Sequence, residues 1–271
     1  MYIDKTIPIV MTIAGSDSSG GAGIQADLKT FAANKVYGTS VITAVTSQNT
    51  LGVDDVFELP VSNVISQIEA NMSDVGANVI KIGMLSTAEI IKGVHDKLTD
   101  YPNLKIVLDP VMVAKGGDSL LRVNAIETLK DLLLPMAYVV TPNVPEATVL
   151  TGIDIDGIES AKLAAMKLYK MGANSVVIKG GHINNNPVTD LLYNGDIFEV
   201  FSAERINTMN THGTGCTFAS ALACGIAYNK TIVNAVKDAK SYVTGAISNN
   251  FPIGKGNGPL NHFYEFWDQT I

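Results

Sequence analysis

Cysteine is scarce in this chain, which has Cys216 and Cys224 among its 271 residues. Both fall in one expected helix, and their spacing along it corresponds to about 12 Å. A disulfide needs Cα atoms within about 7 Å of each other. We therefore expect two unpaired thiols, as in a protein of the reducing cytoplasm. The four histidines are scattered without ligand spacing, so the sequence does not indicate a zinc site.

Long apolar runs and runs of like charge are also missing. No stretch approaches the roughly 18 uninterrupted apolar residues that a membrane helix needs, and residues 1–8 show no secretion signal. The net charge of -7 and the pI of about 5.0 argue against a nucleic-acid partner. A hydrophobic content of 46% with 17% charged residues predicts a large buried core. We expect a protein that binds neither membranes nor nucleic acid.

The chain does contain an alternation of short β-branched runs with amphipathic segments. Several runs are apolar on both faces, as buried parallel strands are. The alternation predicts a mostly parallel sheet with helices on both faces. The expected strands are residues 9–14, 40–46, 79–84, 106–111, 138–141 and 175–179. The expected helices are residues 23–34, 63–74, 87–98, 123–133, 160–171 and 219–227.

The pattern changes after Lys179. Two apolar runs, residues 190–193 and 197–201, flank Asn194-Gly195, which is a strong signal for a two-residue hairpin. We expect this antiparallel hairpin to extend the parallel sheet. The chain has no internal repeat and no linker long enough to divide it, so residues 1–271 are expected to form one α/β domain.

The segment Asn210-Thr211-His212-Gly213-Thr214-Gly215-Cys216 carries the clearest chemical signal. Gly213 and Gly215 flank Thr214 directly before the alanine-rich helix. A loop of this kind directs backbone N–H groups outward at the positive end of a helix, where an anion binds. Cys216 falls in the first turn, a position that lowers the pKa of a thiol. An anion site beside a polarised thiol suggests phosphoryl transfer.

Other candidate residues lie at the carboxyl ends of the expected strands, where ligands bind in open parallel sheets. The first strand runs into a loop with four glycines in nine positions, which allows a ligand close to the backbone but also suits a tight turn. Asp109 stands out, because a buried carboxylate is costly unless it is paired or binds metal. The other strand-end candidates are Gln48, Met84, Asn143 with Glu146, and Lys179.

Each of these strand-end candidates also has an ordinary explanation. The amide of Gln48 suits the edge of a heterocycle but also caps a strand. Asn143 and Glu146 could orient waters around Mg²⁺, or they could cap a helix. Met84 fits the core as well as the wall of a ligand pocket. Their shared placement at strand ends favours a site.

Together these motifs resemble the ribokinase-like superfamily in its vitamin-kinase branch. They are similar to those of the bacterial hydroxymethylpyrimidine/phosphomethylpyrimidine kinases of thiamine synthesis. The matching segments run in order from Ile9 to Phe263: Ala14-Gly15-Ser16-Asp17, residues 20–27, Lys81-Ile82-Gly83-Met84, Thr141-Pro142-Asn143, Lys179-Gly180-Gly181-His182, residues 210–216, and residues 254–259 with His262.

The resemblance implies a three-layer α/β/α sandwich and a kinase that uses ATP and Mg²⁺. Its implied substrate is 4-amino-5-hydroxymethyl-2-methylpyrimidine, phosphorylated to the monophosphate and then to the diphosphate. Gln48 would pair with the aminopyrimidine edge. The pocket would be completed by Gly15, Ala22, Asp27, Met84 and Val111.

The resemblance also assigns a phosphate end to the site. The anion hole would be formed by Gly213, Thr214, Gly215 and Cys216. Asp109, Asn143 and Glu146 would organise Mg²⁺ around the phosphates. Lys179 and His212 would lie along ATP, with Lys255 and Gly256 near its base. A homodimer is expected from the resemblance alone.

Three positions qualify these expectations. The family usually has proline where this chain has Ser18, which should soften the loop without affecting the chemistry. Sugar kinases of the superfamily have aspartate where Cys216 stands, so the thiol could act as a base or only shape the anion hole. Residues 114–118, with Lys115, are interpreted as a flap that closes over the acceptor and excludes water.

Two other functions fit parts of the pattern. A pyridoxal kinase of the cysteine-containing type is built on nearly the same motifs, but that branch can have methionine at the position of Gln48. A catalytically silent pyrimidine-binding sensor would not need the phosphoryl site that Gly213, Asp109 and Glu146 suggest. The kinase of the hydroxymethylpyrimidine is the preferred interpretation.

Overall fold

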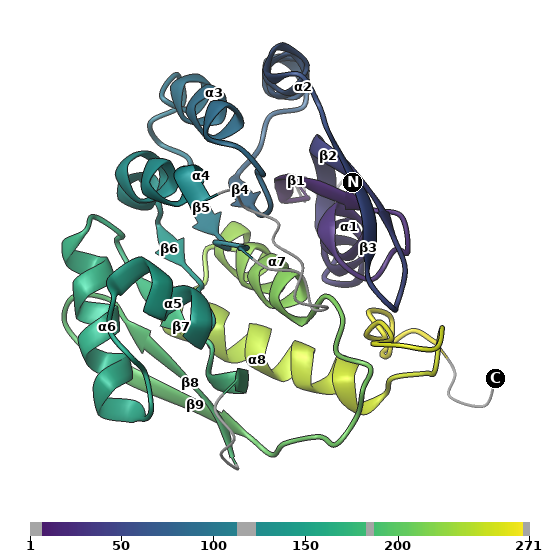
Figure 1. Cartoon of the computed structure of the whole chain (residues 1–271), viewed down its shortest axis with the longest axis vertical. Helices are drawn as coiled ribbons and strands as arrows, with labels where there is room; N and C mark the ends of the chain where they lie inside the picture. Colours follow the sequence, from purple (N-terminus) through teal and green to yellow (C-terminus); the bar gives the residue numbers. More distant parts are fainter. Residues whose placement is uncertain (1–6, 113–122, 183–186, 268–271) are drawn as a thin grey trace, which may run out of the picture.

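A mixed β-sheet runs through the centre of the molecule in the computed structural model, which describes residues 7–112, 123–182 and 187–267 (Figure 1). Within these residues the sheet has nine strands in the order β3-β2-β1-β4-β5-β6-β7-β8-β9. Strands β2, β1, β4, β5, β6 and β7 pair in parallel, whereas β3, β8 and β9 join antiparallel. The strands are β1 (Ile9–Asp17), β2 (Tyr37–Gln48), β3 (Val53–Glu58), β4 (Val79–Ile82), β5 (Lys105–Leu108), β6 (Val139–Val140), β7 (Val176–Ile178), β8 (Val188–Tyr193) and β9 (Phe198–Ala203).

Helices cover both faces of this sheet (Figure 1). One face carries α1 (Gly23–Ala33), α7 (Thr214–Ala227) and α8 (Ile232–Ser248). The other face carries α2 (Val61–Asp74), α3 (Ala88–Leu98), α4 (Val123–Thr128), α5 (Val144–Thr151) and α6 (Ile158–Lys170). The expected three-layer α/β/α sandwich is confirmed.

The two cores follow from the alternation of side chains along each strand. Ile80 and Ile82 of β4 pack on the α2–α3 face, whereas Val79 packs on the α1–α7 face. Lys81 therefore points toward α1 and α7, where it is fully buried. An ionised side chain inside an apolar layer needs a partner, so this position marks a polar centre beneath the helices.

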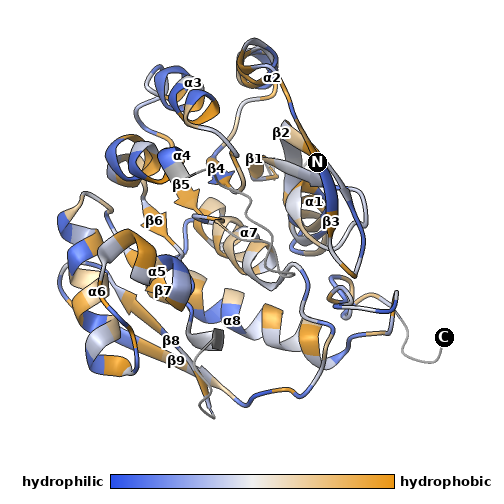
Figure 2. Ribbon diagram, viewed as in Figure 1, coloured by the Kyte–Doolittle hydropathy of each residue, from blue (hydrophilic) through white to orange (hydrophobic). Residues whose placement is uncertain are grey.

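Helix α7 lies between the sheet and α8, and its sequence explains why it can do so. Every residue from Thr217 to Ala227 is buried, and Figure 2 shows α7 without a continuous hydrophilic face. A helix of that composition needs burial on all sides. Small residues allow close packing, since a Cβ on Gly225 would lie 2.9 Å from the Cβ of Ala235 in α8. This close contact packs the carboxyl-terminal part of α7 against α8.

The predicted elements agree with the structure in kind and differ at their ends. All six expected strands and all six expected helices are present, as is the hairpin, now β8 and β9 around Gly195 at a φ of +93°. Strands β4 and β5 end at Ile82 and Leu108, before the polar residues that follow them. The helix expected over residues 123–133 is α4 followed by a π-helical turn, Leu129–Leu133.

Three elements were not predicted from the sequence: β3, α5 and α8. Strand β3 has exposed acidic residues among its apolar ones, so it lacks the apolar pattern of the parallel strands. Helix α5 has eight residues and little amphipathic character, and α8 follows α7 too closely to be separated from it by pattern alone.

No helix in the described ranges combines the length and apolarity needed to cross a membrane. Cys216 and Cys224 are both free thiols on α7. The expected flap with Lys115 lies outside the described residues.

Candidate functional site

The amino ends of α1 and α7 meet at the carboxyl edge of the sheet. Neither N-cap residue, Ala22 of α1 or Gly213 of α7, supplies a side-chain cap. Gly213 has a φ of +82°, and a Cβ there would overlap the carbonyl oxygen of Gly21 and lie 3.3 Å from the Cα of Ala22. Only glycine lets the two loops touch. The first N–H groups of a helix have no partner within it, so both ends present donors suited to an anion.

Lys179 and Asp109 lie beside the α7 terminus. The Lys179 Nζ donates to Asp109 Oδ1 over 2.8 Å, and a Cβ on Gly215 would lie 3.2 Å from that Nζ and 3.6 Å from Asp109 Oδ2. Burial alone lowers the pKa of Lys179, but Asp109 and Glu146 outweigh it and raise the pKa above its usual value. A fixed positive charge therefore lies next to the backbone of Gly215.

Asn143 and Glu146 form the capping box of α5. Asn143 Oδ1 accepts from the Glu146 N–H at 2.9 Å, and Glu146 Oε2 accepts from the Asn143 N–H at 2.7 Å. Helix capping, the alternative explanation from the sequence, is therefore confirmed for both side chains. Burial raises the pKa of Glu146 to about 7, Lys179 opposes this, and Asp109 adds to it. Glu146 thus belongs electrostatically to the same cluster as Lys179 and Asp109.

The acidic residues of this cluster were tested as donors for a metal ion. Within the described residues no group of three or more His, Cys, Asp or Glu side chains is placed to hold one. Mg²⁺ at a phosphate site is commonly bound through one or two carboxylates together with phosphate oxygens and waters. Asp109 and Glu146 fit that type of donor set, whereas the amide oxygen of Asn143 is already used by the capping box.

The Cys216 thiol lies where the two helix ends meet. Its surroundings include Lys81, Asp27 and Asp109. Burial raises the pKa of Cys216 to about 11, the nearby Lys81 ammonium lowers it less, and Asp27 and Asp109 raise it further. The Gly23 N–H at the start of α1 has a small lowering effect on this pKa. The expectation of a lowered pKa was therefore wrong, because burial and the Asp27 and Asp109 charges outweigh the Lys81 ammonium. The thiol is protonated at neutral pH.

Asp27 and Lys81 form a buried ion pair that joins four elements. Lys81 Nζ in β4 lies 2.9 Å from Asp27 Oδ2 in α1, and both side chains have an exposed fraction of 0%. Thr12 of β1 and Ser220 of α7 donate to the same carboxylate, each at 2.6 Å. Asp27 was expected to contact a substrate, but its carboxylate has no exposed surface and accepts three internal bonds.

Lys81 was missed as a functional candidate. Its interactions with Cys216 and Asp109 are strong enough that, together with Asp27, they raise its pKa despite full burial. The signal in the sequence was a lysine in the middle of the apolar run Val79-Ile80-Lys81-Ile82. A charge in such a strand indicates a buried partner, and here the partner is the α1–α7 junction.

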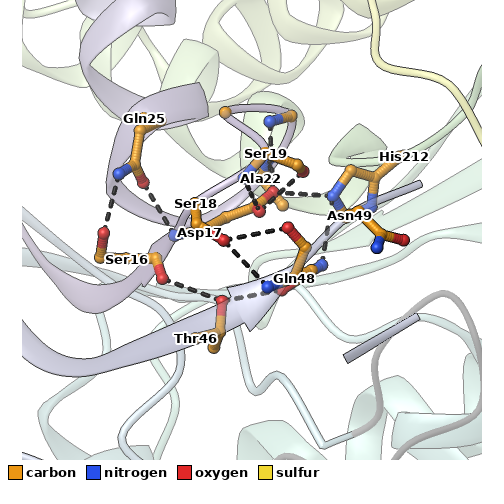
Figure 3. Close-up of polar contacts among 12 residues, drawn as sticks. Ser16, Asp17, Ser18, Ser19, Ala22, Gln25, Thr46, Gln48, Asn49 and His212 are labelled. Atoms are coloured by element: carbon orange, nitrogen blue, oxygen red, sulfur yellow. Dashed lines mark hydrogen bonds and ion pairs between the residues drawn. The ribbon is translucent and has the colours of Figure 1, made fainter. Parts of the chain in front are cut away.

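Gln48 lies at the other side of the same junction (Figure 3). Its side chain contacts Thr46 Oγ1 at 3.0 Å and His212 Nε2 at 3.3 Å. The same His212 nitrogen lies 2.8 Å from Asp17 Oδ2. His212 was expected along the nucleotide with Lys179. In the structure its side-chain contacts are with Gln48 and with Asp17 at the end of β1, and its contact with the nucleotide stays a prediction.

Ser18 fastens the loop after β1 to Gln48. The Ser18 hydroxyl donates to the Gln48 carbonyl and accepts from the Gln48 N–H, both at 2.9 Å. The expectation that serine softens this loop was wrong, because both bonds need a side-chain hydroxyl, which the proline usual in the family lacks.

The structure gives contacts for three residues of the expected pyrimidine pocket, Gly15, Met84 and Val111. A Cβ on Gly15 would lie 3.0 Å from Met84 Sδ, so the backbone of β1 and the Met84 side chain are in contact range. Thr43 Oγ1 fixes Met84 by donating to its carbonyl at 2.7 Å. Val111 is half-buried two residues beyond Asp109 and donates its N–H to the Asp109 carbonyl at 2.8 Å.

Lys255 and Gly256 pack against the turn between β2 and β3, which contains Thr50. Their N–H groups both donate to Thr50 Oγ1 at 3.2 Å, and the Asn257 N–H donates to the Thr50 carbonyl at 2.8 Å. These contacts join the segment to Gln48's end of β2. They give no contact with Lys179, beside which the nucleotide phosphates were expected.

Solved structures with the same architecture include known kinases. Pyridoxal kinase from Staphylococcus aureus in complex with ADP matches with a TM-score of 0.90 at 38% identity, covering 96% of this chain and 95% of that one. Phosphomethylpyrimidine kinase from Clostridium difficile 630 matches with a TM-score of 0.79 at 42% identity, covering 89% and 100%. The fold and these similarities therefore place the chain among small-molecule kinases of the ribokinase-like class.

The sequence gives the family within that class. Residues 17–261 match the family model described as phosphomethylpyrimidine kinase. The hydroxymethylpyrimidine/phosphomethylpyrimidine kinase of Bacillus subtilis is 50% identical over 254 residues, which are 93% of this chain and 94% of that protein. The chain belongs to the phosphomethylpyrimidine kinase family and is a phosphotransferase.

Proposed function

We propose that this protein transfers the γ-phosphoryl group of ATP to 4-amino-5-hydroxymethyl-2-methylpyrimidine, and then phosphorylates the monophosphate to the diphosphate for thiamine diphosphate synthesis. One observation carries the proposal. The His212 ring contacts the Gln48 amide, and the next residue, Gly213, begins the uncapped end of α7. The residue proposed to recognise the heterocycle, Gln48, thus contacts the residue directly before the helix end proposed to bind phosphate.

The backbone N–H groups at Gly215 and Cys216 and the Lys179 ammonium would stabilise the charge of the transferring phosphoryl group. Phosphoryl transfer depends mainly on position and charge stabilisation, so it does not require a thiolate. A Cys216 thiol with a pKa of about 11 supports a neutral role in shaping the anion hole. Thr214 contributes to this shape, because its hydroxyl donates to the Thr211 carbonyl at 2.7 Å and closes the turn.

In this proposal Asp109 and Glu146 bind Mg²⁺, with Asn143 holding Glu146 in place through the capping box. The metal ion would neutralise the phosphate oxygens during transfer. Lys179 would lie along the phosphates of ATP, as its place beside Gly215 supports. The ADP complex of the Staphylococcus aureus pyridoxal kinase supports nucleotide binding on this fold.

The pyrimidine would lie against Gln48, Gly15, Ala22, Met84 and Val111, with Asp27 acting indirectly by holding α1 to α7. We also propose that residues 1–271 act as one domain, in a homodimer, in the cytoplasm. The two free thiols support a reducing compartment, and the single sheet of the described residues supports one domain.

The activity test uses Mg·ATP and the hydroxymethylpyrimidine, with mono- and diphosphate separated by chromatography. We expect the monophosphate first and the diphosphate later. Formation of the monophosphate alone would refute the second step. Formation of neither the monophosphate nor the diphosphate would refute the function. Chelation of Mg²⁺ by EDTA is expected to stop both steps and restored Mg²⁺ to recover them.

Pyridoxal is the second candidate substrate. The 38% identity and TM-score of 0.90 to a pyridoxal kinase favour a weaker activity on it. A parallel reaction with pyridoxal measures this. Product from pyridoxal alone would make pyridoxal kinase the function of this chain.

A further inference from the structure

The side chain of Gln48 lies in a hydrogen-bond network that allows only one arrangement of protons (Figure 3). Its members come from three separate parts of the chain: Asp17 at the end of β1, Thr46 and Gln48 at the end of β2, and His212 before α7. The oxygen and nitrogen of a side-chain amide have the same shape, so their assignment follows from the network around them. That assignment matters, because Gln48 is the residue proposed to recognise the substrate.

The network starts from Asp17, which is an anion. Asp17 Oδ1 accepts from Ser19 N at 2.8 Å and from Ser19 Oγ at 2.7 Å. Asp17 Oδ2 accepts from Gly21 N at 3.2 Å and from Ala22 N at 2.8 Å. Burial alone raises the pKa of Asp17, but the hydrogen bonds from His212 and Ser19 outweigh it and hold the pKa well below its usual range. The carboxylate therefore only accepts hydrogen bonds.

The state of Asp17 fixes the proton on His212. The Nε2 of His212 lies 2.8 Å from Asp17 Oδ2, so this nitrogen must carry a hydrogen and donate it. The same Nε2 lies 3.3 Å from the Gln48 side chain. Nε2 donates its single hydrogen to Asp17 and has no free lone pair, so it cannot accept from the amide NH₂ group. The amide oxygen therefore fits this side, as the second and more distant acceptor of a shared N–H.

Thr46 requires the same orientation from the opposite side. Its hydroxyl lies 3.0 Å from the Ser16 carbonyl and 3.0 Å from the atom placed as Gln48 Oε1, while Gln48 Nε2 is placed toward His212. These two amide atoms exchange places when the amide is turned by 180°. A hydroxyl has one hydrogen, and the Ser16 carbonyl can only accept it. Thr46 Oγ1 must therefore accept from Gln48, so the amide NH₂ faces Thr46.

We propose that the Asp17–His212 pair and Thr46 together lock the Gln48 amide with its oxygen toward His212 and its nitrogen toward Thr46, and so determine which way round the aminopyrimidine binds. The proposal rests on the proposed function. The network uses one N–H and one oxygen lone pair of the amide. One N–H and one lone pair remain for a ligand edge that carries an acceptor next to a donor.

The locked orientation directs the reacting group of the substrate. In 4-amino-5-hydroxymethyl-2-methylpyrimidine the amino group lies between a ring nitrogen and the carbon that carries the hydroxymethyl group. The amino group donates to the Gln48 oxygen on the His212 side, and the ring nitrogen accepts from the amide on the Thr46 side. The hydroxymethyl group then also lies on the His212 side, toward Gly213 and the anion site. The reversed amide would turn it toward Thr46.

The test compares the aminopyrimidine with an analogue that has hydrogen in place of the amino group. The wild-type enzyme should prefer the aminopyrimidine by tenfold or more in kcat/KM, because the analogue leaves the Gln48 oxygen unpaired. His212→Met removes the donor and should reduce this preference by about tenfold, the size of one hydrogen bond. His212→Gln supplies an NH₂ donor from a similar position and should retain most of it.

Thr46 provides an independent arm with a matched control. Thr46→Val should reduce the preference, and Thr46→Ser, which keeps the hydroxyl, should preserve it. Thr39 lies on the same strand, and within the described residues its buried hydroxyl has no hydrogen-bond partner. Thr39→Val should leave the preference unchanged. Circular dichroism confirms that each variant is folded before the kinetics are compared.

The outcomes separate this inference from the proposed function. If the wild-type enzyme does not phosphorylate the aminopyrimidine, the proposed function fails. If it does, and the preference survives both His212→Met and Thr46→Val, the locked orientation is wrong. Equal losses in His212→Gln and His212→Met would also overturn it, because the shape of the ring rather than its N–H would then be what matters.

Discussion

The Cys216 thiol shows how burial overrides a favourable helix position. Its pKa of about 11 lies above the usual value of a cysteine, since burial and the Asp27 and Asp109 charges outweigh the Lys81 ammonium. Below that pKa the folded protein holds the thiol form, and the thiolate appears only as the pH rises through about 11. A group in this state cannot be a strong base at neutral pH.

Alkylation of Cys216 by iodoacetamide is therefore expected to be slow at pH 7 and to accelerate up to the alkaline limit of folding, with no plateau near pH 8.5. Peptide mass spectrometry measures the rate at each pH. Cys224, which is buried on the same helix and whose pKa is also raised, is the internal control and should react more slowly. A plateau for Cys216 near pH 8 would show that the thiol is activated after all.

Lys81 is expected to be among the most sensitive single positions. Lys81→Met leaves the buried Asp27 carboxylate uncompensated, which costs about 3–5 kcal/mol of the free energy of unfolding. The double variant Lys81→Met with Asp27→Asn removes the charge and keeps one acceptor oxygen, while the hydroxyl of Thr12 or Ser220 that faces the new NH₂ group can rotate to accept from it. It should recover part of the stability, as measured by urea unfolding. Lys162→Met, in the exposed pair with Glu159, is the control and should change little. No recovery in the double variant would contradict the pairing.

At the scale of the elements, the junction of α1 and α7 depends on one glycine. Gly213→Ala adds a side chain to a residue with a φ of +82°, and that side chain would overlap the Gly21 carbonyl. The loops must then separate, which displaces the anion-binding N–H groups. We expect at least about a tenfold loss in kcat/KM, by the sensitivity of phosphoryl transfer to position.

Gly76→Ala separates the backbone effect from the contact. Gly76 has a similar φ of +71°, but its added Cβ would meet nothing within 4 Å. This variant should lose about 1 kcal/mol of stability and keep its activity. Equal activity in Gly213→Ala and Gly76→Ala would mean that the contact with Gly21 is not needed.

The elements that sequence patterns predicted are those with a strong local period. Strand β4 is apolar apart from Lys81, and α3 has a regular apolar stripe, so both were found. Strand β3 forms by antiparallel pairing with the end of β2. The hydrophobic pattern of its own sequence does not reveal that pairing. The capping box of α5 was visible as Asn143 and Glu146, but its two explanations, cap and metal site, look the same in a sequence.

The sequence predicted which residues belong to the candidate site better than it predicted which of them contact each other. Strand ends identified Gln48, Asp109 and Lys179, because parallel strands end at one edge of the sheet. The partner of His212 could not be found this way, since Asp17 is 195 positions away and adjacent only in the fold. Asp27 was misassigned for the same reason: its partners Lys81 and Ser220 lie on β4 and α7.

At the scale of the molecule, the site divides into two halves that meet at α7. Lys179 and Asp109 belong to the half at β5–β7, whereas Gln48, Thr46 and His212 belong to the half at β1–β2. Because β4 lies between β1 and β5 in the sheet, the two groups of residues are apart along its edge. The nucleotide and the pyrimidine should therefore bind to different halves. Each ligand should then stabilise the protein independently, by about 2.7 kcal/mol at a concentration 100 times its dissociation constant.

Thermal unfolding with Mg·AMP-PCP, with the hydroxymethylpyrimidine, and with both ligands tests this division. Each variant is compared with its own ligand-free melting temperature, which removes any loss of intrinsic stability. Lys179→Met should abolish the shift caused by the nucleotide and keep the shift caused by the pyrimidine. Gln48→Ala should do the reverse, because the amide contacts Thr46 of β2 and His212, away from the Asp109 cluster. If Gln48→Ala abolished both shifts, the two halves would be one cooperative site, and among the residues that the structure describes the turn from His212 to Cys216 would be the bridge between them.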